Sequence, residues 1–201
     1  MILPFRPMPE GYKEIGPEAK KVFDGVIFDV YQWPQHMFDG STETFERLKR
    51  PDTVVILHVN DGIVTMVKEE QPDGFTDMDL PMGRVNKGEA VKDGAFRELR
   101  EETGIVPERL FYVSSEKPEG KIDWLIHLFI ATGIKDRGDL HADAGGERIS
   151  VIEKGVDEYI DLMVDTKVEL GEYFLKLLLK GEREKVKGMM LKPWEWFEEV
   201  E

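Results

Sequence analysis

The sequence predicts an α/β protein that begins with a small β-rich segment. Three observations support this fold class: several short apolar runs with strand character, one helical period at residues 89–103, and an apolar helical stripe near the C-terminus. A chain of 201 residues with 41% hydrophobic residues can bury a substantial core. We therefore expect an N-terminal β-rich segment at residues 1–50 and one main domain at residues 51–201.

The strand signals begin in the N-terminal segment. Apolar residues partly alternate in residues 22–33, which favours a half-buried strand. The runs TVVILHV and IVTMVK are separated by Asn60-Asp61-Gly62, a strong hairpin signal. Residues 71–83 contain two prolines and two glycines and predict a loop.

The pattern then changes to a helical period at residues 89–103, and Gly104 stands where a helix often ends with glycine. Further strands are predicted for RLFYVSS, WLIHLFIATG and ISVIE. The polar segment KDRGDLHADAGGER reads as a loop of the kind that carries function.

The C-terminal region is predicted to be helical. Its apolar stripe is typical of a helix that faces a core, and consists of Leu170, Phe174, Leu177 and Leu178. The tail KPWEWFEEVE fits a short amphipathic helix.

Composition excludes several classes of function. The 27 basic and 41 acidic residues give a net charge of -14, which argues against broad binding to nucleic acid or to an anionic membrane. There is no cysteine and there are only four histidines, so metal chemistry would have to use oxygen ligands. Two prolines and an arginine interrupt the first eight residues, which form neither a signal segment nor a membrane span, and we expect a cytoplasmic protein.

The predicted helix places its acidic residues beside its apolar face. At about 100° per residue, Val91, Ala95 and Leu99 form an arc that faces the core. Arg97 and Arg100 point outward. Three carboxylates lie at the edges of the arc, namely Glu98, Glu101 and Glu102.

These carboxylates offer a candidate metal site. Glu98 and Glu102 are like charges one turn apart, which costs about 0.2 to 0.5 kcal/mol in an isolated helix. Hard oxygen ligands beside a loop are what Mg²⁺ or Mn²⁺ accepts, and such ions bridge to phosphates. Helix geometry alone leaves a metal site and an ordinary charged rim equally open.

A longer motif at residues 83–105 bears on this choice. Its fixed positions are Gly83, Glu89, Arg97-Glu98, Leu99, Glu101-Glu102 and Gly104-Ile105. Chance agreement at all of them has a probability on the order of 10⁻⁹ per start position, given average residue usage. The chain thus resembles the Nudix hydrolases, which implies an α/β/α sandwich with a mixed sheet and hydrolysis of a diphosphate linked to another moiety.

The resemblance also implies roles for individual residues. Glu98 and Glu102 look like the principal metal ligands, and Glu101 like an assisting ligand and catalytic residue. The carbonyl of Met82 would be a further ligand, and Gly83 lets the backbone turn and approach closely. Arg97 and Glu89 look like a structural pair that holds the loop on the helix.

A wider similarity spans residues 22–180 and is carried by the segments FDGVIFDVYQW, FDGST, DLPMG, HLFIA and GGERISVIE. These segments resemble the ADP-ribose pyrophosphatase branch of the family. The resemblance implies a homodimer whose N-terminal strands exchange between subunits and help to hold the adenine.

The acidic loop of that branch aligns with ERISV and implies a metal-binding or catalytic role for Glu147. The chain has Gly145 and Gly146 where the resemblance implies an additional acid that serves as general base. The base therefore stays open among four carboxylates, which are Asp143, Asp139, Glu147 itself and, if its loop closes over the site, Glu119.

A second departure is VKEEQPDG, where that branch often supplies a phosphate-binding arginine. Phosphate contacts would fall instead to Lys68, Arg84 or metal ions. Aromatic residues of the N-terminal segment could stack on a base, with Phe28 and Trp33 the main candidates beside Tyr31 and Phe38.

The expected reaction is Mg²⁺- or Mn²⁺-dependent hydrolysis of a nucleoside diphosphate derivative by attack of a bound water. ADP-ribose would give AMP and ribose 5-phosphate. The alternative substrates are a nucleotide sugar, a reduced dinucleotide such as NADH, and a dinucleoside polyphosphate. A different alternative is a module that senses a nucleotide without cleaving it.

Overall fold

The computed structural model describes residues 5–118, 120–138, 148–166 and 172–200. Its centre is a mixed sheet of seven strands in the order β13-β5-β4-β11-β9, with β6 paired to β5 and β7 to β4. β4 and β11 run parallel, and the other pairs in this sheet are antiparallel. The strands are β4 (Thr53–Asn60), β5 (Ile63–Glu70), β6 (Thr76–Asp79), β7 (Met82–Arg84), β9 (Arg109–Glu116), β11 (Ile126–Thr132) and β13 (Arg148–Gly155).

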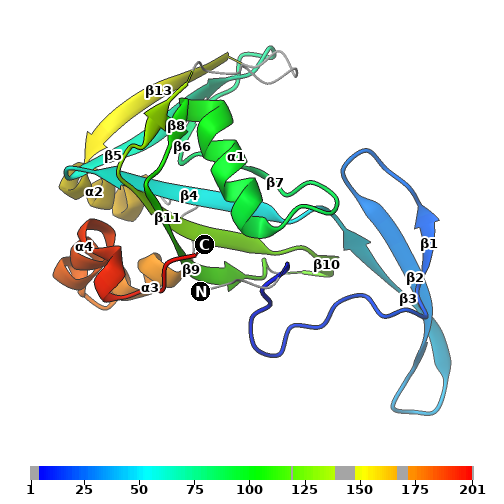
Figure 1. Ribbon diagram of the computed structural model, residues 1–201. Helices are drawn as coiled ribbons and strands as arrows, with labels where there is room; N and C mark the ends of the chain where they lie inside the picture. The colour runs from blue at the N-terminus through cyan, green and yellow to red at the C-terminus, as the bar shows by residue number, and fades with distance from the viewer. Residues whose placement is uncertain (1–4, 119, 139–147, 167–171, 201) are drawn as a thin grey trace.

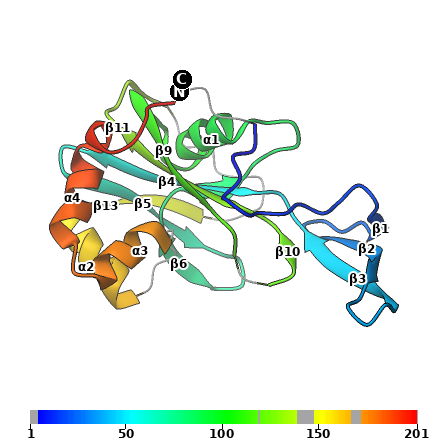
Figure 2. The ribbon, with the colours of Figure 1, turned by 90° about the horizontal axis from the view of Figure 1, so that it is seen from below.

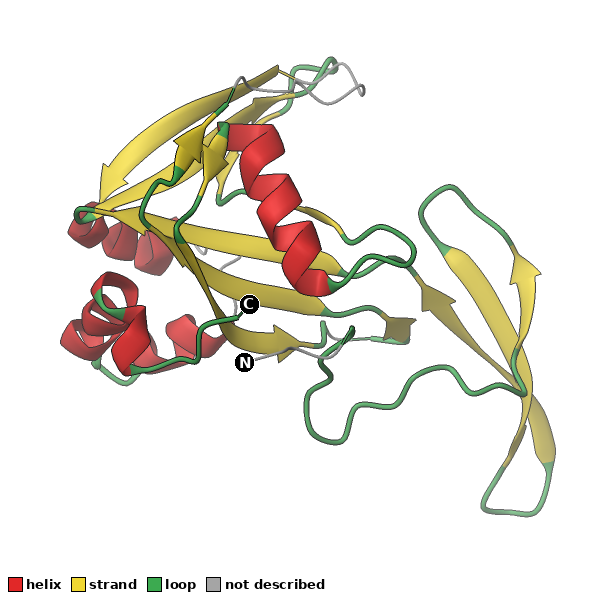
Figure 3. Cartoon of the chain, in the orientation of Figure 1, coloured by secondary structure: helices red, strands yellow, loops and turns green. Residues whose placement is uncertain are grey.

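Helices cover both faces of this sheet (Figures 1 and 3). One core cluster joins Val54 and Ile56 to helix α1, and another joins Val55 and Leu57 to the opposite helices. Successive residues of β4 thus enter different cores, which explains its continuous apolar run. The α/β/α order and the mixed sheet confirm the predicted fold class. The helices are α1 (Val91–Thr103), α2 (Val156–Thr166), α3 (Glu172–Leu179) and α4 (Arg183–Leu191).

The hairpin between β4 and β5 confirms the turn signal. Asp61 and Gly62 both have positive φ, 50° and 78°, as a two-residue turn that matches strand twist requires. The helical stripe is also confirmed for Phe174, which is buried, and for Leu177 and Leu178, which pack against the same core. Leu170 lies outside the described residues.

A second sheet, in the order β1-β2-β3-β10, extends away from the main body (Figures 1 and 2). Three of its strands come from the predicted N-terminal segment. The fourth, β10, comes from the main domain and pairs in parallel with β3, so it joins the two sheets. The strands are β1 (Lys20–Phe23), β2 (Asp29–His36), β3 (Thr42–Lys49) and β10 (Ile122–Asp123).

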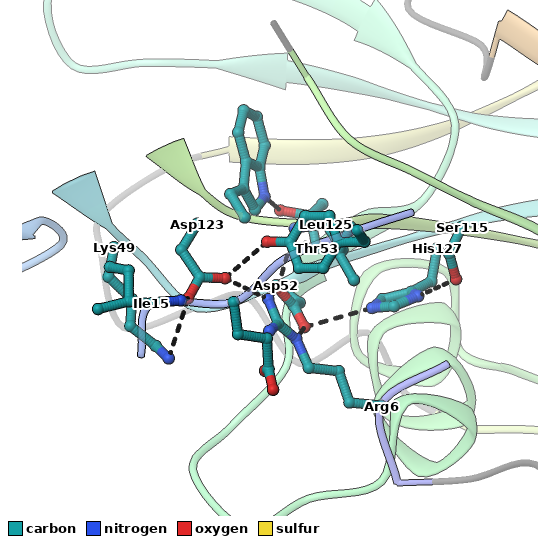
Figure 4. A network of polar contacts seen from close by, with 12 residues as sticks. Arg6, Ile15, Lys49, Asp52, Thr53, Ser115, Asp123, Leu125 and His127 are labelled. Atoms are coloured by element: carbon teal, nitrogen blue, oxygen red, sulfur yellow. Dashed lines mark hydrogen bonds and ion pairs between the residues drawn. The ribbon is translucent and has the colours of Figure 1, made fainter. Parts of the chain in front are cut away.

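A buried polar network fastens the first residues to the main domain (Figure 4). Arg6 donates to both carboxylate oxygens of Asp52, at 2.6 and 2.8 Å, and to Asp123 at 3.0 Å. The hydroxyl of Tyr12 and the backbone N–H of Ile15 also donate to Asp123, which is fully buried. His127 lies 3.4 Å from Asp52. This network sets where the chain enters β4.

Some sequence predictions were wrong. Residues 71–83 were expected to be a loop, yet β6 and the start of β7 lie there because β5 and β4 offer them open edges. The C-terminal tail was expected to be an amphipathic helix, but it has one 3₁₀ turn, Pro193–Glu195, and Glu199 then bridges to Phe111. The two-residue strands β8 (Ile105–Val106) and β12 (Asp136–Arg137) were not predicted.

None of the helices in the described part of the chain combines the length and the apolar character needed to cross a bilayer.

Candidate active site

The motif at residues 83–105 folds as strand β7, a loop and helix α1. The helix runs from Val91 to Thr103 and is capped by Gly104, whose φ of 73° is left-handed and whose N–H donates to the carbonyl of Arg100 at 2.8 Å. A Cβ at Gly104 would also crowd the carbonyl oxygen of Gly138. Glycine is therefore required here on two counts, conformation and space.

Arg97 organises the charged side chains of the motif. Its Nε and Nη2 donate to the two oxygens of Glu89, each at 2.9 Å, which confirms the predicted structural pair. Its Nη2 also donates to the carbonyl of Arg84 at 2.8 Å. Helical spacing pointed Arg97 outward, but the long side chain turns back along the helix, whereas Arg100 is exposed. The loop is thus clamped onto α1.

The same guanidinium reaches two of the predicted metal ligands. Nη1 of Arg97 donates to Glu98 at 2.7 Å and to Glu101 at 3.0 Å. Glu98 is only 9% exposed, and burial raises its pKa although Arg97 opposes the shift. The ionised form of Glu98 is therefore incompletely compensated by its neighbours.

Glycine at position 83 makes room for this carboxylate. A Cβ at Gly83 would overlap the carboxylate of Glu98. On the other side of the helix edge, the N–H of Met82 donates to Glu102 at 3.1 Å. The end of α1 that carries the glutamates therefore lies directly against β7.

The donor set fits a hard divalent cation. Glu98, Glu101 and Glu102 offer carboxylate oxygens beside the backbone of Met82, and Glu98 lacks full compensation. Across the described residues, no three acidic or histidine side chains converge closely enough to hold an ion unaided. Instead, Arg97 contacts Glu98 and Glu101. Four predicted acids lie outside the described residues, namely Glu119, Asp139, Asp143 and Glu147.

A cavity of about 270 Å³ adjoins β7. It touches Met82 and Gly83, so it meets the carboxylate cluster at this strand. Among the described residues, Arg84 lines the cavity and Lys68 does not; Lys68 pairs with Glu70 at 2.8 Å. Of the two predicted phosphate contacts, only Arg84 lines this cavity, and strand β7 lies between the cavity and the carboxylates of α1.

The predicted aromatic residues are separated. Phe28 lines a neighbouring cavity of about 580 Å³, which shares Trp124 with the first. Trp33 lines a different cavity and packs on Phe45, with ring centroids 5.3 Å apart. Sequence reasoning missed Trp124 and Arg50, which both line the first cavity. No local pattern marks either residue, because both lie just before strands and come together only in the fold.

A model of the NUDIX domain matches residues 48–159, more than half of the chain. The chain belongs to the Nudix family. This finding confirms the resemblance that the motif indicated. As a Nudix hydrolase the chain is a pyrophosphohydrolase, and enzymes of this family generally use a divalent cation.

Relatives of this Nudix chain span most of its length. ADP-ribose pyrophosphatase of Bacillus subtilis (strain 168) is 30% identical over 159 residues, covering 74% of this chain and 82% of the relative. Methanol dehydrogenase activator of Bacillus methanolicus is 25% identical over 168 residues, covering 80% and 91%. The crystal structure of an ADP compounds hydrolase superposes with a TM-score of 0.64 at 18% identity, covering 85% of this chain and 98% of that one. The superposition supports the fold alone.

Proposed function

We propose that this Nudix hydrolase cleaves the diphosphate bond of ADP-ribose to give AMP and ribose 5-phosphate. The observation that carries the proposal is the contact at Met82 and Gly83 between the carboxylates of α1 and an arginine-lined cavity. Similarity to the B. subtilis ADP-ribose pyrophosphatase over most of both chains supports this substrate.

The cation would be held by carboxylates of Glu98, Glu101 and Glu102 and by the carbonyl of Met82, with Glu147 as a further ligand. When bound, Mg²⁺ or Mn²⁺ neutralises diphosphate charge and favours ionisation of water. Arg97 keeps two of these carboxylates in place, because its Nη1 contacts both Glu98 and Glu101.

In the reaction, a water oxygen attacks one phosphorus, the bridging P–O bond breaks, and each product keeps one phosphate. A carboxylate accepts the proton that the water loses, and Glu147 and Asp143 are the proposed acceptors. Arg84 contacts the phosphate from the cavity that it lines.

We also propose that residues 1–50 form a dimerisation segment and residues 51–201 the hydrolase domain. The projecting sheet and its connections expose large apolar side chains, as a surface covered by a second subunit would. These are Val22, Phe23, Val26, Ile27, Phe28, Met37, Phe38 and Leu48. Light scattering should give a molar mass twice that of one chain, and Phe23→Asp should lower the measured mass towards that of a single chain. A wild-type protein with the mass of a single chain would contradict the proposed dimer.

A substrate panel tests the activity. Purified protein with Mg²⁺ or Mn²⁺ would be given ADP-ribose, a nucleotide sugar, NADH and a dinucleoside polyphosphate, with products separated by chromatography. We expect the highest kcat/KM for ADP-ribose. A higher kcat/KM for another compound would make that compound the assigned substrate in place of ADP-ribose. Binding of ADP-ribose without release of AMP at any pH would indicate a sensing module.

A further inference from the structure

Two arginines face the cavity beside β7 without acidic partners. The chain has 41 acidic and 27 basic residues, and four of its ten arginines pair with a carboxylate in the described structure, namely Arg6, Arg97, Arg109 and Arg183. Arg50 and Arg84 have no carboxylate within ion-pair distance among the residues that the structure describes, and both line the cavity. Their charges are available to an anion.

The guanidinium of Arg50 lies close to two aromatic rings. Its centre lies 4.2 Å from the ring centroid of Trp124 and 5.7 Å from that of Phe28. The indole N–H of Trp124 donates to Thr53 Oγ1 at 3.1 Å, and Arg50 Nη2 lies 3.5 Å from the same oxygen. Stacking on aromatic rings fixes the plane of a guanidinium and leaves its edge free to donate.

Most of the donor capacity of Arg50 is unused. Its Nε is buried and has no hydrogen-bond partner in the described chain, and its long contact to Thr53 is weak. An arginine carries five N–H donors, and a buried donor without an acceptor costs free energy. An acceptor supplied by a ligand would remove that cost.

Arg84 places a second positive charge beside the cavity. Arg84 of β7 lies opposite Thr53 of β4, and Thr53 follows Arg50 by three residues in the chain. Burial and the nearby charge of Arg84 lower the pKa of Arg50. Two like charges beside one cavity repel each other, and an anion between them would offset the repulsion.

The cavity is placed to receive a phosphate. Thr53 and Val55 point into it, whereas Val54 and Ile56 pack towards α1, so the cavity opens on the other face of the sheet. Met82 and Gly83 line the cavity and also contact Glu102 and Glu98. Strand β7 pairs with β4 alone among the described strands, so a diphosphate that passes its other edge could reach from the carboxylates on one face to both arginines on the other.

We propose that Arg50, together with Arg84, binds a phosphate of the substrate and supplies an arginine contact that β5 lacks. This inference rests on the proposed function, hydrolysis of a diphosphate. The planar edge of Arg50 donates two N–H groups to phosphate oxygens, and Trp124 keeps that edge facing the cavity. Lys68 of β5 remains paired with Glu70.

Three variants of the full-length protein test this. Arg50→Gln removes the charge, Arg50→Lys keeps the charge without the planar edge, and Arg183→Gln is the control, an exposed arginine of α4 paired with Asp161 at 2.6 Å. Binding of methylenediphosphonate, a diphosphate analogue with a non-hydrolysable bridge, would be measured by calorimetry with Mg²⁺. KM and kcat would be measured on the best substrate of the panel, and melting curves would verify folding.

Arg50→Gln should weaken analogue binding and raise KM by about 10- to 100-fold, the range for a lost hydrogen bond to a charged group. Arg50→Lys should fall between that variant and the wild type, and Arg183→Gln should match the wild type. A folded Arg50→Gln protein with KM and analogue affinity within about twofold of wild type would overturn the inference while leaving the proposed hydrolysis intact.

The opposite result also separates the two proposals. If wild-type protein hydrolyses none of the panel but binds methylenediphosphonate through Arg50, the phosphate site stands and the proposed reaction fails.

Discussion

The clusters around Arg97 and Arg6 both combine one arginine with several carboxylates, but the pKa values of their buried carboxylates shift in opposite directions. In each, one arginine bridges more than one carboxylate. In the Arg6 cluster, burial alone would raise the pKa of Asp52, but hydrogen bonds from Arg6 and His127 outweigh it and lower the pKa. In the Arg97 cluster, burial raises the pKa of Glu98 despite the arginine.

The difference lies in the number of donors for each carboxylate. The carboxylate of Asp52 accepts hydrogen bonds from Arg6 and from the N–H of Leu125. The carboxylate of Asp123 accepts hydrogen bonds from Arg6, Tyr12 and the N–H of Ile15. Among the described residues, the only hydrogen-bond donor to the carboxylate of Glu98 is Arg97, which it shares with Glu101. A carboxylate with enough donors is structural, whereas a buried carboxylate short of donors is suited to a cation.

The largest expected effect comes from Glu98→Gln. We expect kcat to fall by about 1000-fold, in line with the several kcal/mol that a catalytic cation contributes. The melting temperature without metal should not fall, because the ionised form of Glu98 is disfavoured by burial.

The matched control is Glu70→Gln, which changes a partly exposed glutamate of β5 that pairs with Lys68. It should leave kcat near that of wild type. Full activity in Glu98→Gln would remove Glu98 from the metal site.

The Arg6 cluster should respond in stability instead. Arg6→Met leaves the buried carboxylates of Asp52 and Asp123 without their shared cation, which should lower the free energy of unfolding by about 3 to 5 kcal/mol. Urea denaturation would measure the loss. Arg183→Met, at an exposed ion pair, should cost less than about 1 kcal/mol. Equal losses in the two variants would mean that Arg6 does not anchor the N-terminal residues.

The smallest effect concerns pH. Against the effect of burial, donors including Tyr12, Ile15 and Arg6 lower the pKa of Asp123, so its ionised form stabilises the fold. That contribution is present above the pKa of an unfolded aspartate, about 3.9, and is lost as the pH falls through the lower pKa of the folded state. Asp123→Asn should therefore lose stability relative to wild type at pH 6, with a gap that narrows towards pH 3. Denaturation curves at several pH values would measure this difference in stability. A difference that widens as the pH falls would contradict the conclusion that the ionised form of Asp123 stabilises the fold.

Signals within a few residues were enough for several elements. The Asn60-Asp61-Gly62 turn, the period of α1 and its end at Gly104 depend on backbone preferences and spacing that neighbouring residues already set. The motif from Gly83 to Ile105 likewise identified the family, because the residues that define the motif lie in one continuous segment of the sequence.

The contacts that distinguish this protein needed the fold. Short strands β6 and β7 form because β5 and β4 offer partners, although residues 71–83 carry loop signals. Arg6 meets Asp123 across 117 positions, and Arg50 meets Trp124 across the joint between two sheets. The sequence by itself determined the family, the hairpin and the acidic helix, since these rest on local spacing. Only the tertiary structure decided which arginines are neutralised and which face a cavity, since that depends on the path of the whole chain.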